Sequence, residues 1–410
     1  MSDILAKTMF MAGMAATAAK SAASYYFRGP RCPKWPLSFQ VRRDMMFSVI
    51  VGRSGWLPTE ADIEHIDFEA IAKGREKWDL PTSELPPEMG AFQPASITCA
   101  SIDIDVGLFV GAGPAESGLC ALVEEDRLDG GRRALSCEIT APASMLLALK
   151  DAASVDRAFG WAPVCQDEKI VLFLHGGAYR FGSPASHRGL AGRLSGMSDL
   201  RCVSIDYRLA PSHPYPAQLH DAFIAFVYLM QQGFKPENIV LVGDSAGGNL
   251  ALALLFLLRH TGIAHKVCGL LLISPWSDLV SYRSSMERNA SYDYLTAPPL
   301  SSPLAPARMF YAPGRKYSQA LLDEMSHPLV SPINGDFRDF PPTLIQAGDK
   351  EILADDIAQL HENLLRDNPE HSDRYIYECY TDMIHVFHQF KELPDARDAF
   401  ASAAKFLGSL

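Results

Sequence analysis

The chain has 410 residues, of which 48% are hydrophobic and 21% charged, and its formal net charge is −11. This composition is typical of a globular protein with a large core and excludes wholesale disorder. Acidic and basic residues are mixed without long blocks of one sign, so we expect no nucleic-acid partner.

The eight cysteines are scattered along the chain. They form no CxxC pair and show no metal-ligand spacing, so we expect free thiols and no bound metal. Reduced thiols suit the cytoplasm, which is the predicted location of the protein.

The first 95 residues are expected to form helices separated by Pro-rich turns, including a helix over 39–51. Residues 8–19 form an apolar run that is shorter than the about 20 residues needed to cross a bilayer. The run favours an amphipathic helix that covers part of the protein or touches a membrane weakly, with a secretory signal as an alternative. The basic stretch from Arg28 to Arg43 is interpreted as a solvated helix face, with contact to a membrane surface as the alternative.

The pattern changes after residue 95. Short strand-like segments occur over 95–147, and from residue 169 apolar runs of strand length alternate with helical stretches. These runs are 170–174, 202–205, 239–242, 267–273, 343–346 and 375–380. Continuous apolar runs are typical of parallel strands covered on both faces, so the pattern predicts an α/β fold with a mostly parallel central sheet.

A Pro-rich stretch over about 277–341 is too long for an ordinary connection and is predicted to be a lid insertion. With the N-terminal helices it would cover the carboxyl ends of the strands, where open α/β sheets bind ligands. The sequence therefore predicts an N-terminal helical lid segment over 1–95 and a catalytic domain over 96–410.

The sequence GDSAG over 243–247 lies between an apolar strand and an Ala- and Leu-rich helix. A nucleophile on a sharp strand-to-helix turn needs small residues two positions before and after it, and Gly243 and Gly247 provide them. Ser245 is the predicted nucleophile. The alternative is a serine that merely caps the helix beginning at Ala246.

The sequence HGGAY over 175–179 follows the strand predicted at 170–174. Backbone N–H groups that bind an oxyanion require an open loop poor in side chains, which a glycine pair permits. Gly177 and Ala178, together with Ala246 beside the nucleophile, are the predicted oxyanion-hole donors. His175 is expected to order this loop rather than to act as a base.

Three motifs together resemble the hormone-sensitive-lipase-like family of esterases. They are HGGAY, the segment DYRLAP over 206–211 with HPYPA over 213–217, and GDSAGGN over 243–249. The chain departs from the family at Ala178, where a third glycine is more common, and RGPRCPKWPLSFQ near the N-terminus is similar to fungal members. The resemblance implies an α/β-hydrolase fold and esterase activity.

The family carries its general base in a loop near the carboxyl end, and His385 stands in the matching loop. The family pattern Asp-x-Leu-x-Asp, matched at Leu353, places the triad acid on Glu351, where this chain has Glu in place of Asp. Asp349 and Asp355 remain alternatives, and Asp355 is expected to anchor the loop by hydrogen bonds.

These residues predict acyl transfer through a covalent serine ester, with Ser245 as nucleophile, His385 as base and Glu351 as the orienting acid. With water as acceptor the chain is a carboxylesterase acting on a small-molecule ester or thioester, without metal or organic cofactor. The alternatives are an acyltransferase or a lactone-forming thioesterase. A non-catalytic small-ligand receptor is less well supported, because His385 is present. The sequence does not indicate an oligomeric state.

Overall fold

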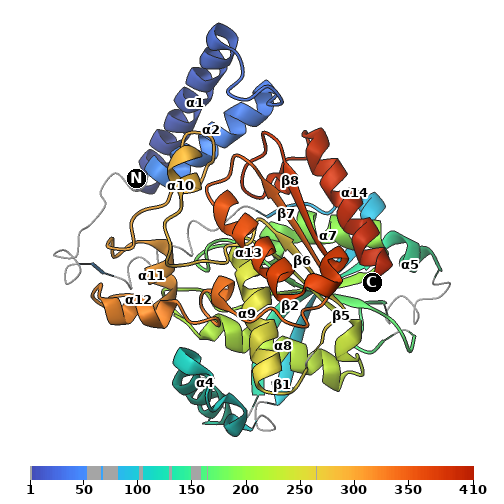
Figure 1. The fold of residues 1–410 in the computed structure, drawn as a ribbon. Coiled ribbons are helices and arrows are strands. Elements are labelled where there is room, and N and C mark those ends of the chain that lie inside the picture. Colours follow the sequence, from blue (N-terminus) through green and yellow to red (C-terminus); the bar gives the residue numbers. More distant parts are fainter. Residues whose placement is uncertain are drawn as a thin grey trace.

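The computed structural model describes residues 2–52, 66–67, 82–100, 105–128, 132–148, 158–163, 165–264 and 266–410. These residues form one eight-stranded sheet with helices on both faces (Figure 1). The strands are β1 (Gly90–Ala100), β2 (Arg132–Pro142), β3 (Ile170–Leu174), β4 (Arg201–Ile205), β5 (Ile239–Asp244), β6 (Gly269–Ile273), β7 (Thr343–Gly348) and β8 (Tyr375–Tyr380).

The sheet has the order β1-β2-β4-β3-β5-β6-β7-β8. β2 is antiparallel to both of its neighbours, and all pairs from β4 to β8 are parallel. The predicted α/β fold with a mostly parallel sheet is confirmed. Each predicted apolar run from residue 170 onward forms or contains a strand. Every residue of β3, β5 and β6 is buried, as expected for central strands covered on both faces, whereas the edge strand β8 is partly exposed.

The α-helices are α1 (Ser2–Arg28), α2 (Leu37–Gly52), α4 (Glu116–Leu128), α5 (Ala143–Ala148), α7 (Pro184–Ser198), α8 (Ala217–Gln231), α9 (Ala246–His260), α10 (Ser284–Arg288), α11 (Pro306–Tyr311), α12 (Gln319–Met325), α13 (Ala354–Asp367) and α14 (Pro394–Ser409). Short 3-10 helices are η2 (Pro87–Met89), η4 (Val106–Phe109), η5 (Gly113–Ala115), η6 (Pro236–Asn238), η7 (Pro332–Asn334), η8 (Pro369–Arg374) and η9 (Phe387–Gln389).

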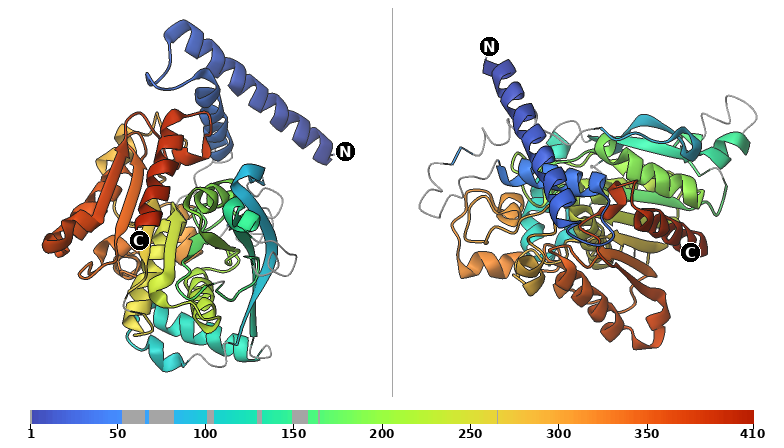
Figure 2. Two further views of the ribbon diagram at one scale, coloured as in Figure 1. Left: turned by 90° about the vertical axis from the view of Figure 1, so that its right-hand side faces the viewer. Right: turned by 90° about the horizontal axis from the view of Figure 1, so that it is seen from above.

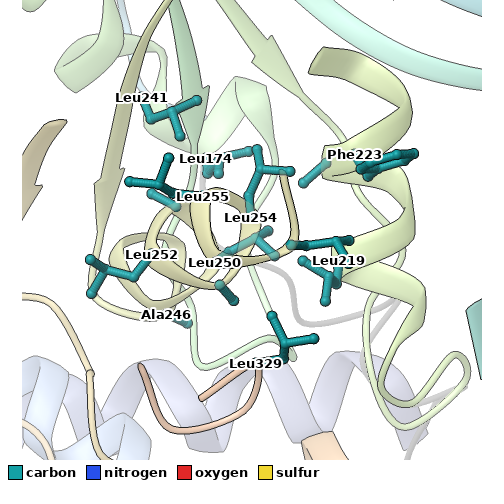
Figure 3. Close-up of a cluster of buried hydrophobic side chains, with 14 of the residues drawn as sticks. Leu174, Leu219, Phe223, Leu241, Ala246, Leu250, Leu252, Leu254, Leu255 and Leu329 are labelled. Carbon is teal, nitrogen blue, oxygen red and sulfur yellow. The ribbon is translucent and has the colours of Figure 1, made fainter. Parts of the chain in front are cut away.

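The core lies on both faces of the central strands, because successive strand side chains point to opposite sides. Val171 and Phe173 of β3 pack with α7 and α14, whereas Leu172 and Leu174 pack with α8 and α9. Figure 3 shows apolar side chains of α9 gathered between the sheet and α8, with Leu219 of α8 beside them. A helix that is apolar on nearly every side is thus anchored directly behind the strand-to-helix turn at its N-terminus.

The predicted lid insertion over 277–341 contains α10, α11, α12 and η7. The buried guanidinium of Arg308 in α11 donates hydrogen bonds to the carbonyl oxygens of Leu300, Ser301 and Arg315. These bonds connect the segments on either side of α11. That this insertion acts as a lid stays a prediction. The predicted boundary between residues 95 and 96 lies within β1, and residues 53–65 and 68–81 of the N-terminal segment lie outside the described residues.

The N-terminal segment contacts the catalytic domain through Trp35 and through Phe39 of α2, which pack against Phe387 and Phe390. Figure 2 shows α1 and α2 at one end of the molecule. The indole nitrogen of Trp35 donates to the carbonyl oxygen of Asp382 at 2.6 Å. The rings of Trp35 and Phe39 lie edge to face with centroids 5.0 Å apart, and Phe39 meets Phe390 in the same way at 4.7 Å. Among the described residues, no helix is both long and apolar enough to span a membrane.

The expectation that the stretch from Arg28 to Arg43 forms a solvated helix face is wrong for Arg43. This side chain is only 3% exposed. Its guanidinium donates to the carbonyl oxygens of Ser291, Tyr292 and Asp293, so it is buried as a hydrogen-bond donor to a distant loop. A buried arginine is stable there because these carbonyls and Asp44 satisfy it.

The substitution Trp35→Ala should lower the free energy of unfolding by about 3–5 kcal/mol, because it removes a fully buried aromatic side chain and its hydrogen bond. Urea denaturation followed by circular dichroism measures the change. Tyr26→Ala, at a residue that is 75% exposed, is the control and should change stability by less than about 0.5 kcal/mol. Equal effects of the two substitutions would show that the N-terminal segment does not belong to the cooperative core.

Candidate active site

The turn between β5 and α9 holds Ser245 in a strained conformation, with φ +53° and ψ −118°. A Cβ on Gly243 would lie 2.2 Å from the carbonyl oxygen of Gly247, and one on Gly247 would lie 1.9 Å from that of Leu174. Only glycine fits at these two positions. Although Ser245 precedes the helix, its side chain makes no capping hydrogen bond, so the interpretation as a simple helix cap is not supported.

Three predicted residues meet at this turn. His385 Nε2 lies 2.8 Å from Ser245 Oγ, and His385 Nδ1 lies 2.8 Å from Glu351 Oε2. Ser245 follows β5, Glu351 follows β7 and His385 follows β8, so all three come from the carboxyl ends of parallel strands. All three side chains are buried. The geometry is that of a nucleophile, a base and an orienting acid joined in series.

Two further hydrogen bonds fix the carboxylate of Glu351. Its Oε1 accepts from the backbone N–H of Gly348 at 2.7 Å and from Ser274 Oγ at 3.1 Å. Ser274 Oγ in turn accepts from the backbone N–H of Val386 at 3.0 Å, beside His385. Ser274 therefore links the acid loop to the histidine loop. Sequence reasoning missed it, although its place directly after β6 is a signal that could have found it.

The other two carboxylates near Glu351 have different partners. Asp355 accepts from the backbone N–H of Ser285 at 2.8 Å and pairs with Arg288 at 2.6 Å. Asp349 accepts from the backbone N–H of Asp382 at 2.7 Å. Neither carboxylate is hydrogen-bonded to His385, so the structure brings only Glu351 of the three into line with the imidazole.

A fourth acidic residue, Asp293, lies near the imidazole and was not found from the sequence. Its Oδ2 accepts from the backbone N–H of Ile352 at 2.8 Å, and its Oδ1 from that of Tyr294 at 2.8 Å. The ring of Tyr294 lies edge-on to His385, with centroids 6.0 Å apart. Asp293 thus holds the residue that follows Glu351, and Arg43 holds the loop that carries Asp293.

The charges around His385 favour its protonated form. Burial alone lowers the pKa of His385, but the hydrogen bond and charge of Glu351, together with Asp293 and Asp244, outweigh it and raise that pKa above its ordinary value. Burial raises the pKa of Asp293 to about 6, with His385 acting against that rise and Glu351 adding to it. An imidazolium formed at this position is stabilised by several carboxylates.

The HGGAY loop has an unusual backbone. Gly177 has φ +112° and Ala178 has φ +53°, and a Cβ on Gly177 would lie 2.1 Å from the carbonyl oxygen of Phe181. The backbone N–H of Gly176 donates to Asp244 Oδ1 at 3.0 Å, which ties the loop to the residue before Ser245. Within the described structure, the N–H groups of Gly177, Ala178 and Ala246 donate to no other group.

The side chain of His175, at the start of this loop, is buried against Tyr207. Its ring stacks on Tyr207, with centroids 4.2 Å apart and an angle of 11° between the planes. Tyr207 in turn donates its hydroxyl to the carbonyl oxygen of His175 at 2.5 Å. Over the described ranges, no three His, Cys, Asp or Glu side chains form a group that could hold a metal ion.

The comparisons with known proteins agree with this fold. A family profile described as "alpha/beta hydrolase fold" matches residues 171–389. An acetyl-hydrolase of Streptomyces hygroscopicus is 35% identical over 251 residues, covering 60% of this chain and 77% of that protein. An esterase of Acinetobacter venetianus is 35% identical over 246 residues, covering 59% of this chain and 75% of the relative.

Solved structures of similar proteins extend over most of the chain. A crystal structure of EstE5 soaked with ethyl alcohol has 26% sequence identity and a TM-score of 0.61, and it covers 90% of this chain and 96% of its own. The hyperthermophilic esterase from Pyrobaculum calidifontis, at 23% identity and a TM-score of 0.58, shares the fold. The chain therefore belongs to the α/β-hydrolase-fold family.

Proposed function

We propose that this chain hydrolyses small carboxylic esters through a covalent acyl intermediate on Ser245. That it is a carboxylic ester hydrolase rests on its family and on relatives that are an acetyl-hydrolase and an esterase. The observation that carries the mechanism is the series of two 2.8 Å contacts from Ser245 through His385 to Glu351. Because similarity of fold alone does not determine activity, these contacts are the stronger argument.

In the acylation step, Ser245 Oγ attacks the ester carbonyl carbon while His385 Nε2 takes the hydroxyl proton. The carbonyl π electrons move to oxygen, and the N–H groups of Gly177, Ala178 and Ala246 would donate to this oxyanion. When the tetrahedral intermediate collapses, the bond to the alcohol oxygen breaks and His385 returns its proton to that oxygen. The acyl group is then esterified to Ser245.

In the deacylation step, His385 removes a proton from water as the water oxygen attacks the acyl carbon. Collapse breaks the bond to Ser245 Oγ, which regains the proton, and releases the carboxylic acid. Glu351 stabilises the imidazolium that forms in both steps. No observation favours an acyltransferase, a lactone-forming thioesterase or a receptor over this hydrolytic cycle.

The substitution Ser245→Ala should abolish ester turnover and leave the fold intact, because Ala fits the turn and only the nucleophile is lost. Release of p-nitrophenol from p-nitrophenyl butyrate measures turnover, and thermal unfolding measures the fold. Ser277→Ala, at another buried serine, is a control that should retain activity. Turnover by Ser245→Ala within tenfold of the unmodified chain would contradict the serine mechanism.

The substitution Glu351→Gln should lower kcat by roughly three to four orders of magnitude, because the amide cannot stabilise the imidazolium and permits the wrong imidazole tautomer. Asp355→Asn is the matched control in the same loop. It should mainly lower stability, since Asp355 bonds Ser285 and Arg288. If Asp355→Asn inactivates a well-folded enzyme while Glu351→Gln remains active, the two roles must be exchanged.

The substitution Asp293→Asn should move the acidic limb of the pH–rate profile to lower pH. The base must be neutral, so activity rises as pH passes the pKa of His385, and the Asp293 charge raises that pKa. Asp278→Asn is the control, because Asp278 is also buried and accepts two backbone N–H groups. Identical profiles for Asp293→Asn and the unmodified chain would show that Asp293 only supports the loop.

A further inference from the structure

Tyr179, the last residue of the HGGAY loop, is held in an unfavourable backbone conformation. Its φ is +60°, directly after Ala178 at +53°, although a bulky side chain rarely adopts a positive φ. Such a conformation persists only where the surrounding structure enforces it. The carbonyl oxygen of Tyr179 accepts from the backbone N–H of Ala210 at 2.8 Å, which fixes the backbone on one side. The rest of the enforcement comes from the buried side chain.

The hydroxyl of Tyr179 is bound by Asn249 in the first turn of α9. It donates to Asn249 Oδ1 at 2.6 Å, and both side chains are buried. Asn249 Nδ2 donates in turn to the carbonyl oxygens of Trp276 at 2.9 Å and Val330 at 3.1 Å. Because two carbonyl groups face the amide nitrogen and a hydroxyl faces the amide oxygen, only one orientation of the amide satisfies all three partners. Asn249 is therefore a fixed acceptor for Tyr179.

The same amide is connected to the nucleophile. The backbone N–H groups of Trp276 and Asn249 both donate to the carbonyl oxygen of Ser245, at 3.0 Å and 3.2 Å. Trp276 thus binds Ser245 through its N–H and Asn249 through its carbonyl oxygen. Hydrogen bonds therefore link the loop of Tyr179 to the turn of Ser245, which are the two parts of the site that must meet the reacting carbonyl group together.

The ring of Tyr179 is held by the insertion over 277–341. It stacks on Phe310 of α11, with centroids 3.9 Å apart and an angle of 12° between the planes. Phe310 is itself buried, and its carbonyl oxygen accepts from the backbone N–H of Tyr215 at 2.9 Å. A stacked ring and a bound hydroxyl leave Tyr179 one position, and its backbone continues directly from Ala178.

Packing alone does not account for the hydrogen bond between Tyr179 and Asn249. When both partners of a buried hydrogen bond are replaced by apolar groups of the same shape, stability often changes little. What the bond adds to packing is a fixed distance between the loop and the turn. Oxyanion donors act only within a narrow range of distances from the oxyanion, about 2.7–3.1 Å, so this distance affects the reaction directly.

We propose that Tyr179 and Asn249 are positioning residues, which set the distance between the oxyanion donors and the nucleophile. The inference rests on the ester hydrolysis proposed above. Both residues act through the backbone of the loop, holding the N–H groups of Gly177 and Ala178 where the oxyanion forms. Because the oxyanion exists only after Ser245 attacks, loss of the bond lowers kcat and leaves KM nearly unchanged.

The test is Tyr179→Phe, which removes the hydroxyl and keeps the ring on Phe310. With p-nitrophenyl butyrate, kcat should fall about tenfold to a hundredfold and KM should change less than about twofold. The second measurement is the dissociation constant of propyl trifluoromethyl ketone. Ser245 Oγ adds to its carbonyl carbon, His385 takes the proton, and the ketone oxygen becomes an oxyanion. This constant should rise by the factor by which kcat/KM falls, because the adduct resembles the tetrahedral intermediate.

The matched control is Tyr375→Phe at the start of β8. It also removes a buried hydroxyl, which donates to the carbonyl oxygen of Phe340 at 2.9 Å, and should leave kcat and ketone binding unchanged. A second comparison uses Asn249→Leu as the background. There Tyr179→Phe should lower kcat by less than about twofold, because the hydroxyl has already lost its partner. Thermal unfolding of each variant measures the separate effect on stability.

Equal ketone affinity in Tyr179→Phe and the unmodified chain would overturn the proposal, and so would a raised KM at unchanged kcat. An equal loss of activity in Tyr375→Phe would also overturn it, since the effect would then be one of stability. Calorimetry measures ketone binding without turnover. A chain that binds the ketone but hydrolyses no ester would therefore contradict the proposed function, while ketone affinity would still test Tyr179.

Discussion

The strained turn at Ser245 is the constraint on which the rest of the site depends. A non-glycine residue at φ +53° costs about 1–3 kcal/mol and persists only where its surroundings enforce it. At Ser245, two features of the surrounding structure enforce this conformation. Gly243 and Gly247 approach neighbouring backbone so closely that no side chain fits, and α9 is fixed behind the turn by its buried leucines (Figure 3). The rigid turn presents Ser245 Oγ to the imidazole.

The base and the acid are held by loops that support one another. Ser274 joins the Glu351 loop to the His385 loop. Asp293 holds the backbone next to Glu351, and Arg43 of α2 holds the loop of Asp293. Residues from five distant parts of the chain therefore determine the position of one imidazole ring. This explains why an N-terminal segment without catalytic residues lies against the site.

The sequence was sufficient to predict the parts of the molecule that leave a periodic or glycine-dependent pattern. The buried parallel strands require continuous apolar runs, and the turn at Ser245 requires glycines at fixed spacing. Ser274, Asp293 and Arg43 could not be predicted in the same way. Each acts through hydrogen bonds with backbone groups or loops far away in sequence, and such contacts impose no spacing. Burial of Arg43 depends on carbonyl groups about 250 residues away, which no local pattern reveals.

The orientation of α1 likewise depends on contacts between residues that are far apart in the sequence. Its sequence predicts an amphipathic helix, but which side faces the protein depends on Asp44 and Ser48 of α2, which bond Ser21 and Thr17. The same side of α1 also carries the partly buried side chains of Met14, Ala18 and Tyr25.

The central claim is that Ser245 is the nucleophile of an ester hydrolase, and covalent labelling tests it most directly. The protein is treated with a p-nitrophenyl phosphonate, whose phosphorus is attacked as an ester carbonyl would be, and the labelled peptide is identified by mass spectrometry. The account predicts one phosphonyl group per chain on Ser245, with esterase activity lost in proportion to labelling and Ser245→Ala unlabelled. A label on another residue, or full activity in completely labelled protein, would contradict it.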